Sequence, residues 1–150
     1  MNSFDIDPEF SRLFSLAILE RAANATLIQQ SAPDADLTIV LTGDKQIQTL
    51  DRNFLGKDTP TDVLSFPASE TDPETGRLYL GDVIISVPRA EAQSSAGGHS
   101  LEDELSLLIV HGVLHLLGHN HADVGEKKRM WGAQNEILMS LGVSPMIIHE

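Results

Sequence analysis

The stretch His111-Gly-Val-Leu-His-Leu-Leu-Gly-His-Asn-His121 carries the most informative pattern in the chain. It closes an apolar segment, 101–117, in which leucine, isoleucine and valine recur at helical spacing and acidic residues fill the first turn. This pattern predicts a helix over 101–117, capped by Ser100. His111 and His115 are about one helical turn apart, so they share one face of that helix.

Gly118 decides what the remaining histidines can do. If the helix ran on, residues 111 and 119 would be roughly 12 Å apart, too far for one ion whose bonds to histidine are about 2.0–2.1 Å. Glycine commonly ends a helix in the left-handed conformation, so the chain is expected to turn back at this position. After the turn, either His119 or His121 can reach an ion held by His111 and His115. The spacing H-x-x-x-H-x-x-G-x-x-H repeats the three-histidine zinc pattern of metzincin proteases and selects His121.

Gly112 departs from the metzincin pattern. A metzincin protease has its general-base glutamate at this position, so peptide hydrolysis lacks its expected base here. The alternative that the histidines are ordinary polar residues on a core helix suits a lone histidine better than three at this spacing. The sequence therefore predicts a metal site, and Gly112 counts against its being a protease site.

Composition limits the class of protein. A length of 150 residues with 41% hydrophobic content is expected to form one domain over 1–150. Cysteine is absent, which excludes disulfides and thiolate metal ligands. The acidic N-terminus does not resemble a secretory signal, and the apolar runs are shorter than the roughly 20 residues that span a bilayer. The expected location is cytoplasmic, without a membrane partner.

The net charge of -12 opposes non-specific attraction to nucleic acid. Any phosphate-bearing partner must be met by local cations, and no DNA partner is expected.

The remaining segments alternate between helical and strand patterns, which suggests layered helices and strands. Helices are predicted over 8–25, 45–54, 88–95 and 123–141, and strands over 37–42, 62–66 and 78–87. Asp44 is expected to cap the helix over 45–54. The strands over 62–66 and 78–87 are expected to pair antiparallel, with 69–77 as an exposed loop between them.

Three signatures resemble, in order and spacing, those of the bacterial YbeY family, which is described as metal-dependent endoribonucleases of ribosomal RNA maturation. They are Gly56-Lys-Asp-Thr-Pro-Thr-Asp-Val-Leu-Ser-Phe-Pro67, Leu80-Gly-Asp-Val-Ile-Ile-Ser86 and the histidine stretch. The resemblance implies an α+β fold with a small mixed four-stranded sheet flanked by helices. It also implies one zinc ion per chain, held by His111, His115 and His121 in a metzincin-like site.

The resemblance further implies a zinc-dependent, single-strand-specific endoribonuclease acting in 3′ end processing of small-subunit rRNA and in ribosome quality control. Its implied partners are single-stranded RNA, rRNA and small-subunit ribosomal proteins or assembly factors. The family's substrate-side arginine falls on Leu55, which removes a cation expected near the scissile phosphate. Lys57 or Arg52 is expected to substitute if RNA cleavage is retained. His119 stands where the family often has tyrosine and adds a titratable ring beside the metal.

A three-histidine zinc site leaves an open position for water and can bring that water's pKa to about 7. The catalytic candidates are His111, which is also a ligand, Lys57, which would hold phosphate, and His119, which would act as acid or base. Three acidic residues have supporting roles as hypotheses: Asp58 and Asp62 in orienting the loop or accepting a proton, and Asp82 in supporting a ligand histidine.

Two other functions compete with the nuclease. The first is a metalloprotease, against which Gly112 counts. The second is a zinc-stabilised ribosome-assembly module without nuclease activity, favoured by the acidity and by Leu55. Structural zinc usually has four protein ligands, so His119 as a fourth ligand would favour the module.

Overall fold

The fold is built on one mixed sheet. The computed structural model describes residues 2–55, 62–119 and 123–143. Within these ranges β1 (Asn2–Ile6), β2 (Asp36–Thr42), β3 (Val63–Thr71) and β4 (Leu78–Ser86) form a four-stranded sheet in the order β1-β2-β4-β3. The pairs β1–β2 and β2–β4 are parallel, whereas β3 and β4 form an antiparallel hairpin. The mixed sheet and the antiparallel pair agree with the prediction from sequence.

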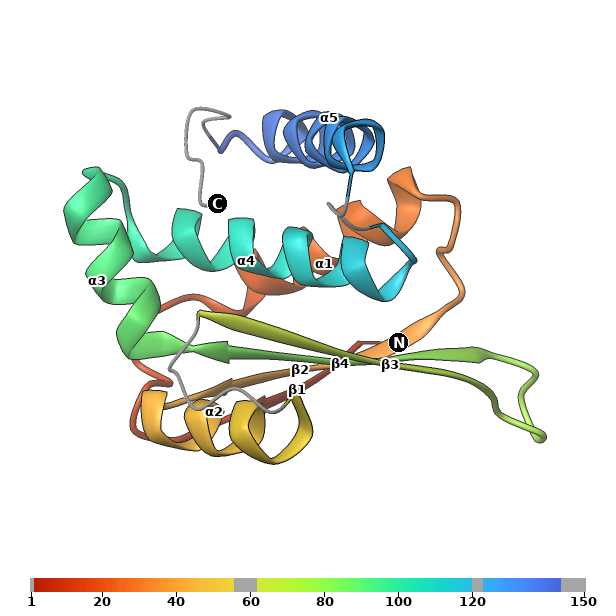
Figure 1. Cartoon of the computed structure of the whole chain (residues 1–150), viewed down its shortest axis with the longest axis horizontal. Coiled ribbons are helices and arrows are strands. Elements are labelled where there is room, and N and C mark those ends of the chain that lie inside the picture. The colour runs from red at the N-terminus through yellow and green to blue at the C-terminus, as the bar shows by residue number, and fades with distance from the viewer. Residues whose placement is uncertain (1, 56–61, 120–122, 144–150) are drawn as a thin grey trace.

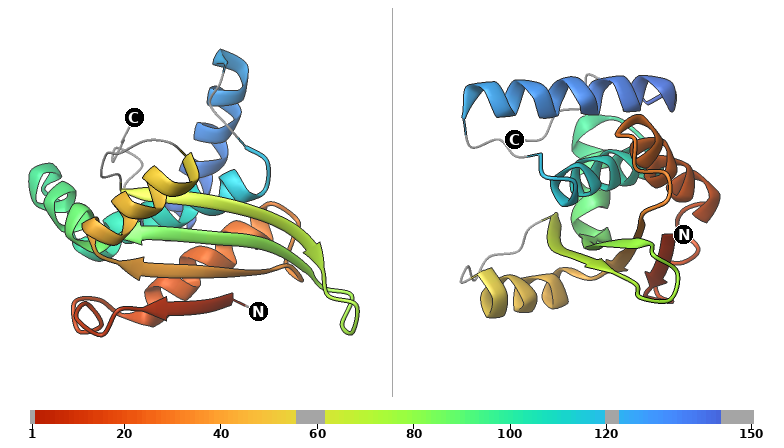
Figure 2. Two further views of the ribbon diagram at one scale, coloured as in Figure 1. Left: turned by 60° about the horizontal axis from the view of Figure 1, so that its bottom comes forward. Right: turned by 90° about the vertical axis from the view of Figure 1, so that its right-hand side faces the viewer.

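Helices cover both faces of the sheet (Figure 1). Helices α1 and α4 lie on one face and α2 on the other, while α5 lies on the outer side of α1 and α4 (Figure 2). The bounds are α1 Leu16–Gln29, α2 Asp44–Leu50, a π-helical turn Asp51–Leu55, α3 Val87–Gly97, α4 Leu101–Leu116 and α5 Val124–Ser140. This arrangement confirms the α+β class. Across the described ranges, no helix combines the length and apolar character needed to span a bilayer.

Helix α4 is the centre of the core. It contacts α1, α3, α5 and the two strands of the hairpin. Most of its residues from 104 to 116 are therefore buried, including Leu105, Ile109 and Leu114, which have no exposed surface. A helix enclosed in this way needs apolar residues nearly all round, which explains its near-continuous apolar sequence. Ser100 caps it as predicted, with its Oγ accepting from the backbone N–H of Asp103 at 3.1 Å.

The predicted helix over 8–25 is wrong in its first half. The chain forms turns before Ser15, where Asp7 Oδ1 accepts from the Glu9 N–H at 3.0 Å. The helix begins at Leu16, one residue after the Ser15 N–H donates to Glu102 of α4 at 2.7 Å. Phe10 is buried all the same, so the apolar spacing in this segment reflects burial without a helix.

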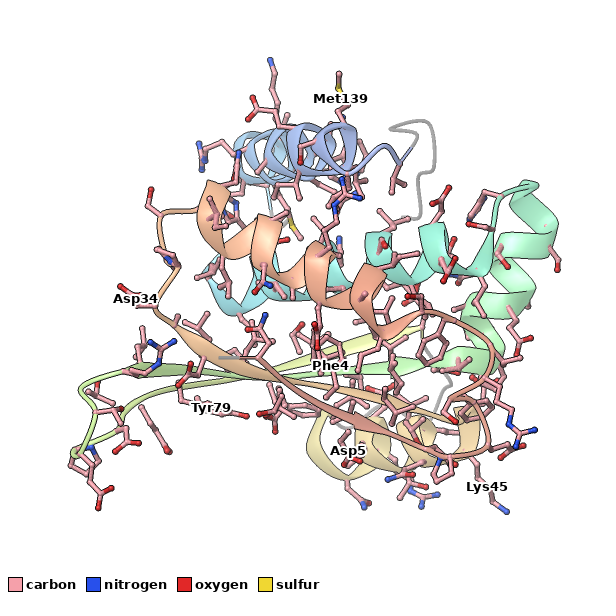
Figure 3. The ribbon with its side chains drawn as sticks, turned by 180° about the vertical axis from the view of Figure 1, so that it is seen from behind. Phe4, Asp5, Asp34, Lys45, Tyr79 and Met139 are labelled. Atoms are coloured by element: carbon pink, nitrogen blue, oxygen red, sulfur yellow. The ribbon has the colours of Figure 1, made fainter. Side chains whose placement is uncertain are left out.

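Strand β1 was not predicted from the sequence. Its side chains alternate, with Phe4 on the face covered by α1 and α4 and Asp5 on the face that carries α2 (Figure 3). Phe4 packs against the main core, whereas Asp5 is exposed. On one side its backbone pairs in parallel with β2, a contact distant in sequence.

The remaining differences are at element ends. Strand β3 continues through Pro67 to Thr71 with a register shift, so the exposed excursion begins only at Asp72. Proline is tolerated there because β3 is an edge strand. The resulting hairpin projects beyond the helices (Figure 2).

Helix α2 begins at Asp44 with Gly43 as its cap, whereas Asp44 was the predicted cap. The Oδ1 atom of Asp44 accepts a hydrogen bond from the Ser86 hydroxyl at 2.5 Å.

Candidate metal centre

Helix α4 brings His111 and His115 together as predicted. Their rings are half-buried, with centroids 4.7 Å apart and planes at 78°. The Nε2 atom of His115 lies 3.1 Å from the Nε2 atom of His111. The two nitrogens that face each other therefore come from adjacent turns of one rigid helix.

The other ring nitrogens are held by oxygen atoms. The Nδ1 of His111 lies 3.0 Å from Oε1 of Gln134 in α5, and the Nδ1 of His115 lies 2.9 Å from the backbone oxygen of His119. Both oxygens are acceptors, so each Nδ1 carries the proton and donates it. Each Nε2 is then left with a lone pair in the neutral ring.

This donor set fits a zinc ion. Two lone pairs 3.1 Å apart repel each other unless a proton or a metal ion lies between them. Tetrahedral zinc with bonds of about 2.0–2.1 Å places two ligand nitrogens about 3.3–3.4 Å apart, close to the separation found. The predicted third ligand, His121, lies outside the described residues. Within the described ranges, no group of three histidine or carboxylate side chains is assembled.

The chain turns at Gly118 as predicted. Gly118 has φ +98°, a conformation that residues with a side chain rarely adopt. The turn is closed by the His119 N–H, which donates to the Leu114 carbonyl at 3.0 Å. It also delivers the His119 carbonyl to His115. The Nε2 atom of the His119 ring donates to Oε1 of Gln30, just past the end of α1, at 2.7 Å.

Gly112 lets α4 approach the sheet closely. A Cβ atom at this position would lie 2.5 Å from Cγ1 of Val83 in β4. The Ser65 hydroxyl of β3 donates to the Gly112 carbonyl at 3.1 Å, which ties the edge strand to the same turn of helix. Because this side of the helix has no room for a side chain, the glutamate of a metalloprotease cannot be accommodated without a shift of helix or strand.

A hollow lies beside the turn that ends α4. It has a volume of about 220 Å³ and is lined by Leu117, Gly118, His119, Glu126 and Arg129. Arg129 belongs to the basic run 127–129 near the start of α5, where the Lys127 ammonium lies 4.6 Å from the centre of the Trp131 ring. Arg129 therefore lies next to the turn that carries His119, together with the acidic Glu126.

Two acidic candidates from the sequence, Asp62 and Asp82, accept hydrogen bonds from neighbouring side chains. Asp62 accepts from Nε2 of Gln93 at 3.4 Å, and the same amide donates to the buried Glu104 of α4 at 2.8 Å. Asp82 accepts from the Tyr79 hydroxyl, and burial together with this hydrogen bond raises the pKa of Tyr79.

Other oxygens hold the Nδ1 atoms of His111 and His115, so Asp82 supports neither of these two rings, and His121 lies outside the described residues. Lys57 and Asp58 lie outside the described residues, and Leu55 ends the π-helical turn.

Sequence reasoning did not identify Gln134 or Gln30 as part of the site. Gln134 has one signal in the sequence: it interrupts the apolar stripe of α5 formed by Met130, Ile137 and Leu138. Gln30 has none, because it follows α1 at an ordinary polar position.

Fold and site together define a class: α+β proteins in which two histidines of a central helix present their Nε2 atoms to a common point. The sequence model of the family described as endoribonuclease YbeY matches residues 2–142. The chain belongs to this family.

Curated relatives span most of the chain. A protein of Dehalococcoides mccartyi named endoribonuclease YbeY is 42% identical over 132 residues, covering 79% of this chain and 77% of the relative. One of the same name from Halalkalibacterium halodurans is 44% identical over 135 residues, covering 85% and 84%. A Thermotoga maritima protein with a solution structure has a TM-score of 0.65 at 25% identity, covering 94% of this chain and 89% of that protein.

Proposed function

We propose that this chain is a zinc-dependent endoribonuclease that cleaves single-stranded RNA during 3′ end processing of small-subunit rRNA and in ribosome quality control. Membership of a family whose relatives are named endoribonuclease supports the reaction class. One observation carries the metal dependence: two Nε2 atoms lie 3.1 Å apart while both Nδ1 atoms donate to oxygen. RNA is the proposed substrate, and small-subunit proteins or assembly factors are the proposed partners.

His111, His115 and His121 would hold the ion. When bound, zinc supplies Lewis acidity toward a phosphoryl oxygen and makes water a stronger acid at neutral pH. The protein's part is to keep the ligand rings oriented, which the oxygens of Gln134 and His119 do.

Other residues are proposed to handle substrate and protons. Lys57 would hold a phosphate of the RNA, and His119 would give or take a proton beside the scissile bond. Gln30 accepts from Nε2 of His119, which leaves Nδ1 of that ring as its proton acceptor in the neutral form.

The zinc-stabilised assembly module is the second candidate, and the net charge of -12 is the observation that favours it. A structural zinc would draw a fourth protein ligand, for which His119 is the nearest histidine in sequence to the proposed set. Its Nε2 donates to Gln30, so only Nδ1 of this ring is left to coordinate an ion, and the metal content of a His119 variant tests the module.

The test is metal content measured together with RNA cleavage. Wild-type protein is expected to contain one zinc per chain and to cleave single-stranded RNA, with cleavage lost in chelator. The variant His115→Ala should lose the metal, because His115 is the middle ligand of the proposed set, and its thermal stability should no longer depend on zinc. The variant His119→Tyr should keep the metal.

Lys45→Ala serves as a control, because Lys45 is exposed on α2 across the sheet from the histidines. Undiminished zinc in His115→Ala would overturn the ligand assignment. Zinc binding without RNA cleavage under any ionic condition would favour the assembly module.

A further inference from the structure

Gln134 is a buried amide in an otherwise apolar stripe. Its neighbours in the buried face of α5 are Met130, Ile137 and Leu138, and Gln134 itself is 7% exposed. Helical spacing would favour leucine or methionine at such a position. A buried amide is unfavourable unless it is hydrogen-bonded, and the Oε1 atom of this one meets Nδ1 of His111 at 3.0 Å.

We propose that Gln134 is a positioning residue for the metal centre. By accepting from Nδ1, it fixes His111 in the tautomer with the proton on Nδ1, so that the Nε2 lone pair faces His115. It also fixes the angle of the ring, because a hydrogen bond to a buried side chain leaves little freedom of rotation. The inference rests on the proposed function in one respect, namely that zinc is the group that the two Nε2 atoms serve.

The two histidines are supported in different ways. His115 donates to a backbone oxygen only four residues further along the chain, so its support comes with the turn at Gly118. His111 depends on another helix, because Gln134 lies 23 residues away on α5. Helix α5 is held against the body by its apolar stripe and by a hydrogen bond from Gln29 of α1 to Glu136 at 3.0 Å. The placement of α5 therefore determines the state of one proposed ligand.

The experiment compares three variants with wild-type protein. Gln134→Leu removes the acceptor at similar volume, Gln134→Glu keeps an acceptor oxygen, and Asn135→Leu makes the same kind of change at the exposed neighbouring position. Zinc affinity is measured by competition with a chelator of known affinity. The tautomer of His111 is measured in metal-free protein from the ¹⁵N shifts of its ring nitrogens.

Wild-type protein is expected to show His111 protonated on Nδ1 alone near pH 8. Gln134→Leu should bind zinc about 10- to 100-fold more weakly, which is the usual effect of losing such a partner, and should show a mixture of tautomers. Gln134→Glu should retain wild-type affinity within a few fold, and Asn135→Leu should match wild type in both measurements. If Gln134→Leu does not fold, Gln134→Asn withdraws the oxygen by one methylene and gives the same expectation.

Unchanged zinc affinity and an unchanged tautomer in Gln134→Leu would overturn the proposal. So would a loss in Gln134→Glu as large as in Gln134→Leu, because that result would assign the residue to packing alone. Failure of the proposed function looks different: wild-type protein would then bind no zinc, while the tautomer of metal-free His111 would still respond to Gln134→Leu.

Discussion

At the scale of single residues, Gly112 shows a conflict between helix propensity and packing. Alanine is ordinarily better than glycine inside a helix by roughly 1 kcal/mol. At position 112, however, the new methyl would meet Cγ1 of Val83 at 2.5 Å, and valine is a short, stiff side chain on a central strand. Overpacking of this kind costs about 1–3 kcal/mol, so packing is expected to outweigh propensity.

Gly112→Ala is therefore expected to destabilise the protein by about 1–2 kcal/mol in urea unfolding. The matched control is Gly132→Ala in α5, where a Cβ would meet no atom within 4 Å. That change should be neutral or stabilising by up to about 1 kcal/mol. Equal stabilisation by both substitutions would show that α4 can move away from the sheet without cost.

The two glutamines of the site mark the limit of residue-level prediction. The pairing of His111 and His115 could be predicted because residues four apart on one helix share a face. Gln134 contacts His111, 23 residues away in sequence, and Gln30 contacts His119, 89 residues away. No local sequence pattern predicts contacts between residues so far apart. A polar residue at a stripe position does indicate an unidentified partner, but only the fold says which one.

At the scale of elements, helices and strands with a buried face were predicted well and the N-terminal elements were not. Helix α4 and strands β2 and β4 have apolar patterns that match their period. Strand β1 alternates over only five residues, and its pairing partner begins 30 residues later. The residues before α1 have helical apolar spacing, but Asp7 and Ser15 direct the chain into turns and onto α4.

The β3–β4 hairpin is anchored by a forked ion pair. Arg77 Nε lies 3.0 Å and 3.1 Å from the two oxygens of Asp36, and its Nη2 lies 2.8 Å from Oδ1. This hydrogen-bonded guanidinium lowers the pKa of Asp36 from 3.8 to about 2. Because the pKa of Asp36 is lower in the folded state, the ion pair stabilises the fold above pH 3.8. This contribution to stability is lost as the pH falls toward 2.

Asp36→Asn is therefore expected to lower stability at pH 7 by up to about 1 kcal/mol, the range for partly exposed pairs. The difference from wild type should shrink as the pH falls from 5 toward 2, as followed by urea unfolding at each pH. Arg77→Lys should lose part of the same stability because lysine lacks the fork. Asp5→Asn, at an exposed position of β1, is the control. A difference that stays constant with pH would show that the carboxylate charge is not the cause.

At the scale of the whole molecule, charge limits how RNA is bound. The chain has ten basic and 22 acidic residues. Arg77 forms an ion pair with Asp36, and Nε of Arg89 lies 3.7 Å from Oδ1 of Asp44, the first residue of α2. Arg129 lies next to the turn that carries His119. RNA affinity is therefore expected to depend on a few cations near the site and to fall as salt is added.

Leu55→Arg is expected to strengthen RNA binding and to steepen its salt dependence by up to about one unit, because arginine adds a forked phosphate contact. Metal content should not change, since position 55 is outside the proposed ligand set. The matched control is Leu78→Arg, which adds the same charge on the projecting hairpin. Affinity and cleavage rate are measured across a salt series. Equal gains from both variants would indicate a general charge effect and no phosphate contact at position 55.

The backbone oxygen that holds His115 has a consequence for inheritance. A side-chain partner such as Gln134 can be lost by one codon change, whereas the carbonyl of residue 119 is present whatever amino acid is encoded there. A substitution of the His119 side chain therefore leaves the hydrogen bond from Nδ1 of His115 to this carbonyl in place. A substitution of Gly118 does not, because its φ of +98° keeps the turn in place. Of the two rings, His115 has the more mutation-tolerant partner, provided that one glycine is retained.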